Sequence, residues 1–208
     1  GMVYASLEQC PVIGGTVKSL DSAAAKAMPG VVDVVQIPDG VAVVASSYWA
    51  AVKARRALKI EWDMGPGAAV STASMINGTM EAAKNGKVIA VQPPVGDAKT
   101  AIANSAKQIS ATYITPLLSH SPLEPMNFTA HVTAGKALLI GGSQFQQGAQ
   151  GATAAALGLK PEDVDVQTTF LGGGFGRRIE LDNVVQAAQI SKAVRLPVKL
   201  VWSREDDM

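Results

Sequence analysis

The sequence has 208 residues, a formal net charge of +1, 48% hydrophobic residues and only 17% charged residues. A charge so close to zero gives no basic field that would favour a nucleic-acid partner. The charged fraction lies below the roughly 25% of ordinary soluble domains. We therefore expect apolar surface that packs on another protein part or drives self-association, with burial inside a single domain as the alternative. The single cysteine, Cys10, excludes an internal disulfide and a cysteine-based zinc or iron–sulfur site.

The two ends of the sequence give an expectation about its extent. No basic–apolar leader opens the sequence, and no run of 18 apolar residues predicts a membrane span. The sequence starts within a strand-like run and stops at Met208, just after another strand-like run, Val198–Trp202. We therefore expect the chain to be a piece of a longer protein.

Residues 1–64 are typical of a small α+β unit. Alternating or continuous apolar runs predict strands, and two alanine-rich segments predict helices. The predicted strands are Met2–Leu7, Thr16–Leu20, Val31–Ile37, Val41–Ala45 and Leu58–Trp62, and the predicted helices are Ser22–Met28 and Tyr48–Ala57. Pro38-Asp39-Gly40 predicts a hairpin turn. Gly65-Pro66-Gly67 interrupts either periodicity, so we place a domain boundary there.

Residues 68–208 form the second predicted domain. Its predicted helices are Ser71–Asn85, Ala98–Ala106 and Gln147–Leu157, and its predicted strands are Lys87–Val91, Gln108–Thr115, Asn127–Thr133 and Lys136–Ile140. Gly135 predicts a hairpin between the last two strands, and Pro93-Pro94 predicts a stiff connection.

A glycine-rich stretch follows a predicted strand near the end of this domain. Val164, Val166 and Phe170 alternate on one face, which predicts a half-buried strand. The glycine-rich residues 172–176 come next, and apolar residues between 181 and 188 recur at helical spacing. A strand, a glycine turn and a helix in this order direct backbone N–H groups towards an anion and let a ligand approach the main chain.

Several familiar motifs do not fit this chain. A dinucleotide fingerprint needs a glycine where Arg177 stands, and a P-loop needs a Gly-Lys-Ser/Thr triplet that is absent. His120 and His131 have no third ligand at zinc-site spacing, and no Gly-x-Ser-x-Gly nucleophile elbow occurs. From spacing alone, residues 172–176 are either a tight turn or a ligand-binding loop. Arg177 and Arg178 are correspondingly either contacts to a cofactor phosphate or a salt-bridged rim.

Two further segments carry candidate site residues. Glu124 precedes Pro125, which holds it in an extended conformation suited to a fixed hydrogen-bond acceptor. It either satisfies neighbouring backbone N–H groups or faces a substrate pocket. Gln144 follows a glycine pair and carries both a donor and an acceptor, as recognition of neutral polar groups requires. The alternative interpretation is that the segment around Gln144 binds no ligand and only connects the end of a strand to the start of a helix.

These segments together resemble one known family. GGGFGRR at residues 172–178 resembles the glycine–phenylalanine loop of the molybdopterin-binding large subunits of the xanthine dehydrogenase and aldehyde oxidase family. The double arginine resembles the isoquinoline 1-oxidoreductase beta-subunit branch. Residues 29–63 resemble an α/β-hammerhead domain, and residues 124–127, 143–144 and 198–208 resemble family segments in the same order. The resemblance implies an α+β fold, in which a hammerhead (residues 1–64) precedes the first part of a molybdenum cofactor-binding domain (residues 68–208).

The resemblance also implies an activity and a cofactor. The family hydroxylates an electron-poor carbon of an N-heterocycle or aldehyde with oxygen from water. It uses a molybdenum-pyranopterin, in bacteria often as the cytosine dinucleotide, and passes electrons to iron–sulfur clusters on a partner subunit or domain. Carried over to this sequence, Gln144 lies beside an oxo ligand of the metal, and Gly173 and Gly174 permit the approach of the cofactor. The backbone of Phe175 and Gly176 lies against the metal's ligand sphere.

In the same carry-over, Arg177 is a cofactor-contact candidate and Glu124 is a substrate-pocket candidate. Two departures limit the resemblance. Xanthine-type members have Gly-Lys-Glu where this chain has Arg177, Arg178 and Ile179, which argues against a purine substrate. The family's catalytic glutamate lies in a later half of the subunit, so we expect no catalytic residue here and an inactive chain without the rest of that subunit. The rival hypothesis is a non-catalytic module that binds an anion or a partner subunit through the glycine loop.

Overall fold

The computed structural model describes residues 1–87, 89, 91–93 and 95–208. These residues form two compact units, one made of Gly1–Ala68 with Ser119–Met208 and the other of Ala69–Leu118. The strand predicted at Lys87–Val91 and the Pro93-Pro94 connection include positions 88, 90 and 94, which lie outside the described residues. The predicted division into residues 1–64 and 68–208 stays a prediction.

The first unit has a mixed α+β fold, as predicted. Its strands are β1 (Val3–Gln9), β2 (Thr16–Asp21), β3 (Val31–Ile37), β4 (Gly40–Ala45), β5 (Lys59–Asp63), β6 (Asn127–Thr133), β7 (Lys136–Gly141), β8 (Val164–Thr168) and β9 (Val198–Val201). Its helices are α1 (Ala23–Lys26), α2 (Tyr48–Arg55), α5 (Gln146–Leu157), α6 (Asp182–Val194) and α7 (Arg204–Asp207). The hairpins predicted at Pro38–Gly40 and Gly135 are both confirmed by antiparallel pairing of β3 with β4 and of β6 with β7.

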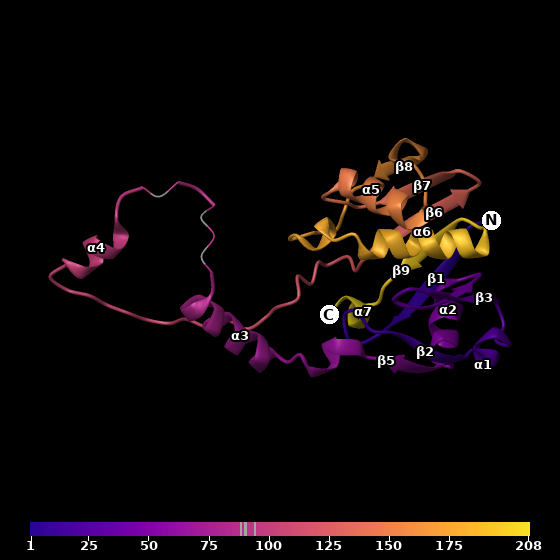
Figure 1. Cartoon of the computed structure of the whole chain (residues 1–208). Coiled ribbons are helices and arrows are strands. Elements are labelled where there is room, and N and C mark those ends of the chain that lie inside the picture. The colour runs from indigo at the N-terminus through magenta and orange to yellow at the C-terminus, as the bar shows by residue number, and fades with distance from the viewer. Residues whose placement is uncertain (88, 90, 94) are drawn as a thin grey trace. The chain divides into compact units, whose positions relative to one another are not determined.

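Seven of these strands form one sheet in the order β3-β4-β1-β9-β6-β7-β8 (Figure 1). β9 lies between β1, with which it runs parallel, and β6, with which it is antiparallel. Strands from the first 64 residues and strands from the last 82 therefore share a single sheet, while β2 and β5 pair separately. β8 closes one edge, parallel to β7.

The burial of β4 explains why its sequence is continuously apolar. Val41 and Val43 belong to a small cluster with residues of α1 and α2, whereas Ala42 and Val44 belong to the large core that includes α6. A strand covered on both faces needs apolar side chains at every position. The order of side chains along β4 thus reflects its place inside the unit.

Helix α6 fixes the exit of the glycine-rich stretch. It packs against β6 and lies beside α5 (Figure 1). Val184, Ala187 and Ile190 are almost fully buried in the large core. Burial of three such side chains contributes a few kcal/mol to stability. The loop that precedes α6 therefore ends on a well-anchored element.

The second unit contains α3 (Thr72–Asn85) and α4 (Ala98–Ala103). Ser71 and Ser74 form a capping box at the start of α3, and Asp97 accepts a hydrogen bond from the backbone of Thr100 at the start of α4. The strand predicted at Gln108–Thr115 is wrong, because this segment contains no regular secondary structure. Among the described residues, none of the helices has the length and apolar character that crossing a membrane requires.

The end of β8 also differs from the prediction. The strand stops at Thr168, and Phe170 lies beyond it as a fully exposed side chain. β8 is an edge strand whose register with β7 ends at Thr168 opposite Gly141. Phe170 therefore has no neighbouring strand that would keep it in the alternating pattern.

Candidate functional site

The loop at residues 172–176 has an unusual backbone conformation. Gly173, Phe175 and Gly176 have φ values of +97°, +52° and +96°. This region is open to glycine and costs a residue with a side chain about 1–2 kcal/mol, so Phe175 is strained. Phe175 is 73% exposed, so burial of its side chain does not offset this strain. Retained strain in an exposed loop is a feature of functional sites.

The side chain of Gln144 holds this loop from the end of β7. Its Oε1 accepts hydrogen bonds from the backbone N–H groups of Gly176 (3.2 Å) and Arg178 (3.3 Å). Its own backbone N–H donates to the carbonyl of Arg178 (3.1 Å). Because both loop partners are donors, the amide oxygen must face the loop. The Nε2 group makes no hydrogen bond within the described part of the chain, and Gln144 is exposed, so this donor is available to a ligand.

Two glycines are required by side chains of the protein itself. A Cβ at Gly174 would overlap Oε1 of Gln144, and a Cβ at Gly172 would lie 2.6 Å from Cβ of Glu124. The resemblance predicted that position 174 is a glycine because a cofactor approaches it. In the structure, the group that would collide with a side chain at this position is the amide of Gln144. Beside Gly176 the space is more open, with Nε2 of His120 as the nearest atom, 3.6 Å from a built Cβ.

Glu124 contacts the start of the loop at Gly172. Its Oε2 accepts from the backbone N–H of Gly172 (2.7 Å) and from Nη2 of Arg178 (2.8 Å), and its Oε1 accepts from Nδ2 of Asn127 (2.9 Å). Burial raises the pKa of Glu124, but the hydrogen bonds from Gly172 and Asn127 and the charge of Arg178 outweigh it, so the net pKa is lowered. The ionised carboxylate satisfies a backbone N–H, which is one of its two predicted roles. Its place in a substrate pocket stays a prediction.

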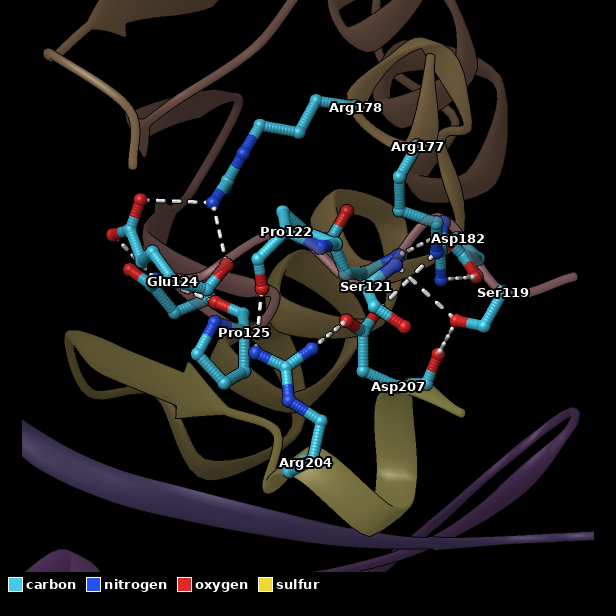
Figure 2. A network of polar contacts seen from close by, with 12 residues as sticks. Ser119, Ser121, Pro122, Glu124, Pro125, Arg177, Arg178, Asp182, Arg204 and Asp207 are labelled. Carbon is cyan, nitrogen blue, oxygen red and sulfur yellow. Dashed lines mark hydrogen bonds and ion pairs between the residues drawn. The ribbon is translucent and has the colours of Figure 1, made fainter. Parts of the chain in front are cut away.

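Arg178, like Arg177, was expected to be either a contact to a cofactor phosphate or part of a salt-bridged rim, and only Arg177 was carried over as a cofactor-contact candidate. The side chain of Arg178 is 1% exposed. Nε donates to the carbonyl of Gly173 (2.8 Å), and Nη2 donates to both the carbonyl (3.0 Å) and the carboxylate of Glu124 (Figure 2). The only signal for it in the sequence was the double arginine, which does not say which of the two faces the loop.

Arg177 turns the other way, into a separate ion-pair network (Figure 2). Its guanidinium makes two hydrogen bonds to Asp182 (3.1 and 2.9 Å), and Nε lies 3.5 Å from Oδ1 of Asp207. It also stacks over the ring of Trp202, 5.2 Å from the centroid. Burial lowers the pKa of Arg177, but Asp182 and Asp207 outweigh it and raise the pKa further above its ordinary value. This geometry favours the salt-bridged reading of Arg177, whose role as a cofactor contact stays a prediction.

A buried carboxylate connects Arg177 to the end of the chain. Asp207 in α7 pairs with Arg204 (3.2 Å) and faces Arg177. Burial raises the pKa of Asp207, although the charges of Arg177 and Arg204 oppose it. Arg204 also donates to the carbonyl of Leu123 (3.2 Å), one residue before Glu124. Within this network, it is therefore Arg204 that contacts the segment leading to Glu124.

Comparison with known proteins decides the family. Residues 80–208, more than half of the chain, match the family model of the molybdopterin cofactor-binding domain. The chain belongs to this family. The resemblance to molybdopterin-binding subunits found in the sequence is thereby confirmed, and an isoquinoline 1-oxidoreductase subunit beta is among the relatives.

Two curated relatives of this molybdopterin cofactor-binding domain cover the whole chain. The chain is 31% identical over 222 residues to the isoquinoline 1-oxidoreductase subunit beta of Brevundimonas diminuta. It is 34% identical over 219 residues to the membrane-bound aldehyde dehydrogenase [pyrroloquinoline-quinone] of Gluconacetobacter polyoxogenes. The chain spans 28% of the length of each relative.

The fold agrees with solved structures of the same group. The crystal structure of quinoline 2-oxidoreductase from Pseudomonas putida 86 superposes with a TM-score of 0.74 at 21% identity, covering 100% of this chain and 32% of that one. At this identity the likeness shows the fold alone. The predicted fold class is confirmed.

The residues of the loop fit a bound cofactor with acceptor atoms. The Nε2 group of Gln144 is a donor with no partner in the described part of the chain, and a Cβ built at Gly176 would meet His120 only at ordinary contact distance, 3.6 Å. Phe175 is exposed and Gly176 is half-buried, and the backbone N–H of Gly176 contacts the same amide group. In a molybdopterin cofactor-binding domain, these are the groups on this chain that could hold the cofactor.

Proposed function

We propose that this chain is the first part of the large subunit of a molybdenum hydroxylase. The observation that carries the proposal is the amide of Gln144, whose oxygen is held by two backbone N–H groups of the loop while its N–H donor has no partner in the described part of the chain. The family membership and the names of the oxidoreductase relatives support the same conclusion. Because the chain spans 28% of these relatives, the remainder of the large subunit is a required partner.

The cofactor would be a molybdenum-pyranopterin, in the cytosine dinucleotide form, and would supply two-electron oxidation of an electron-poor carbon. The substrate would be an N-heterocycle or an aldehyde, and electrons would leave through iron–sulfur clusters on a partner subunit. Gln144 would donate a hydrogen bond to an acceptor atom of the bound group, and the backbone of Phe175 and Gly176 would orient it. A preorganised donor of this kind stabilises charge that develops during reaction. Glu124 would keep the loop in shape from the protein side.

Substitution of Gln144 in the full-length enzyme tests this proposal. Gln144→Ala should lower turnover of an N-heterocyclic or aldehyde substrate about 10²-fold, as loss of one preorganised donor does elsewhere. Its molybdenum content should stay close to that of the wild type, because one hydrogen bond contributes little to total cofactor binding. The matched control is Gln147→Ala, an exposed glutamine in the first turn of α5, which should have no effect.

Three results would contradict the proposal. The first is full turnover in Gln144→Ala. The second is a wild-type full-length protein that holds no molybdenum, and the third is one that holds a quinone instead, the cofactor in the name of the second relative. Absence of any redox group, together with anion binding at the glycine loop, would favour the alternative of a non-catalytic module. The 208-residue chain alone should carry neither stoichiometric molybdenum nor turnover, and its self-association stays a prediction.

A further inference from the structure

We propose that Arg178 is a positioning residue that holds the glycine loop and the amide of Gln144 in the geometry needed to meet a ligand. The inference rests on the proposed function, because it takes this loop and Gln144 as the cofactor-facing groups. Arg178 would act through them and would not touch the cofactor itself.

The contacts of Arg178 join three segments that lie far apart in the sequence. Its backbone N–H and carbonyl are both bonded to Gln144, at 3.3 and 3.1 Å. Its Nε is bonded to the carbonyl of Gly173, in the middle of the loop. Its Nη2 reaches the carbonyl and the carboxylate of Glu124, at 3.0 and 2.8 Å. A shift of this one residue would therefore move Gln144, the loop and Glu124 together.

This arrangement needs the planar fork of a guanidinium. Three acceptors lie around Nε and Nη2, and they point in directions that match the fixed N–H vectors of arginine. A lysine in the same place has a single ammonium group and could reach only some of these acceptors from one position.

The cost of burying this arginine also indicates a positioning role. Its side chain is 1% exposed, and its Nη1 has no hydrogen-bond partner in the described part of the chain. A Cβ added at Gly142 would lie 3.4 Å from Nη1, so Gly142 packs close to this side of the guanidinium. A buried charge with an unused donor is a poor source of stability compared with an apolar side chain of similar size. Its presence is explained by the geometry that it imposes on the loop.

Arg177 provides a matched control one residue away. It is also largely buried and ion-paired, but its partners are Asp182 of α6 and Asp207 of α7. None of these contacts reaches Gln144, Gly173 or Glu124. Arg177→Lys and Arg178→Lys are therefore equal changes in chemistry with different expected effects on the loop.

Hydrogen–deuterium exchange of the full-length protein tests the hold on the loop without reference to activity. In Arg178→Lys, the backbone amides of Gly172 and Gly176 should exchange about tenfold faster, because the acceptors that protect them lose their fixed positions. In Arg177→Lys, exchange of these amides should stay as in the wild type. Unchanged exchange in Arg178→Lys, or equal acceleration in both variants, would overturn the inference.

A rescue experiment separates positioning from general support of the fold. Arg178→Ala should lower kcat per bound molybdenum about 10²-fold, as small misplacements of oriented groups do. Millimolar guanidinium should restore part of this loss, and ammonium should not, because only guanidinium reproduces the fork. No rescue by guanidinium, or equal rescue by ammonium, would refute the positioning role. A wild-type protein without molybdenum would refute the proposed function instead, while the exchange comparison would still decide whether Arg178 holds the loop.

Discussion

Replacement of Gly174 by alanine should disturb the site through a single neighbouring side chain. Gly174 is not in the left-handed region, so alanine is compatible with its backbone. The new Cβ, however, would overlap Oε1 of Gln144 and lie 2.7 Å from its Cδ. The exposed amide must therefore turn away, which breaks its hydrogen bonds to the N–H groups of Gly176 and Arg178. Each such bond contributes about 0.5–1.5 kcal/mol.

We expect the free energy of unfolding of Gly174→Ala to be about 1–2 kcal/mol below that of the wild type. This is the loss of two hydrogen bonds, reduced by about 0.4–1 kcal/mol because alanine restricts the unfolded chain. Urea denaturation of the chain measures the change. In the full-length enzyme, turnover should fall about 10²-fold, as for Gln144→Ala, because the same donor loses its orientation.

A double-mutant cycle decides whether the effect passes through Gln144. In a Gln144→Ala background the amide is absent, so Gly174→Ala should cost almost nothing further. The control is Gly151→Ala in α5, where a built Cβ meets no atom within 4 Å. That change should raise stability by about 0.5–1 kcal/mol. Equal costs of Gly174→Ala in both backgrounds, within about 0.5 kcal/mol, would refute the reasoning.

Two further predictions concern the support of the site. The pKa of Glu124 is lowered in the folded state, so its ionised form adds stability that is complete above the ordinary value of 4.5 and is lost as the pH falls through and below that value. Glu124→Gln should therefore flatten the acid limb of a plot of unfolding free energy against pH, and an unchanged limb would contradict this assignment. Gly141→Ala should cost about 1–3 kcal/mol, because its Cβ would lie 2.7 Å from the ring of Phe128, and Phe128→Leu should relieve most of that cost in urea titrations. Additive costs of the two changes would show that the ring is not the obstacle.

Most regular elements could be predicted because their signals are local. The hairpin at Gly135 and the start of α6 near Asp182 depend on turn chemistry and periodicity within a few residues. Gln108–Thr115 has strand-like composition, but a strand forms only when a partner strand accepts its hydrogen bonds. Phe170 continues the alternating apolar pattern of the sequence, but the pairing of β8 with β7 ends at Thr168, so Phe170 is not part of the strand.

The candidate site shows the same division between local and distant information. Gln144 and Glu124 could be named from their segments, but their contacts with the loop come from residues 32 and 48 positions away. Arg177 and Arg178 look equivalent in the sequence. Only the packing of the loop shows that one joins α6 and α7 and the other joins Gln144, Gly173 and Glu124.

The central place of β9 has a consequence for how the protein is made. β1 leaves the ribosome long before β9, the neighbour that it needs on one side, which lies near residue 200. At roughly 5–20 residues per second, β1 waits about 10–40 s for that neighbour. During this time β1 and, later, β6 each present an open edge, which is the kind of surface that pairs with other chains. Nascent chains of this protein should therefore depend on chaperones until β9 has emerged, and should complete the seven-stranded sheet in one late step.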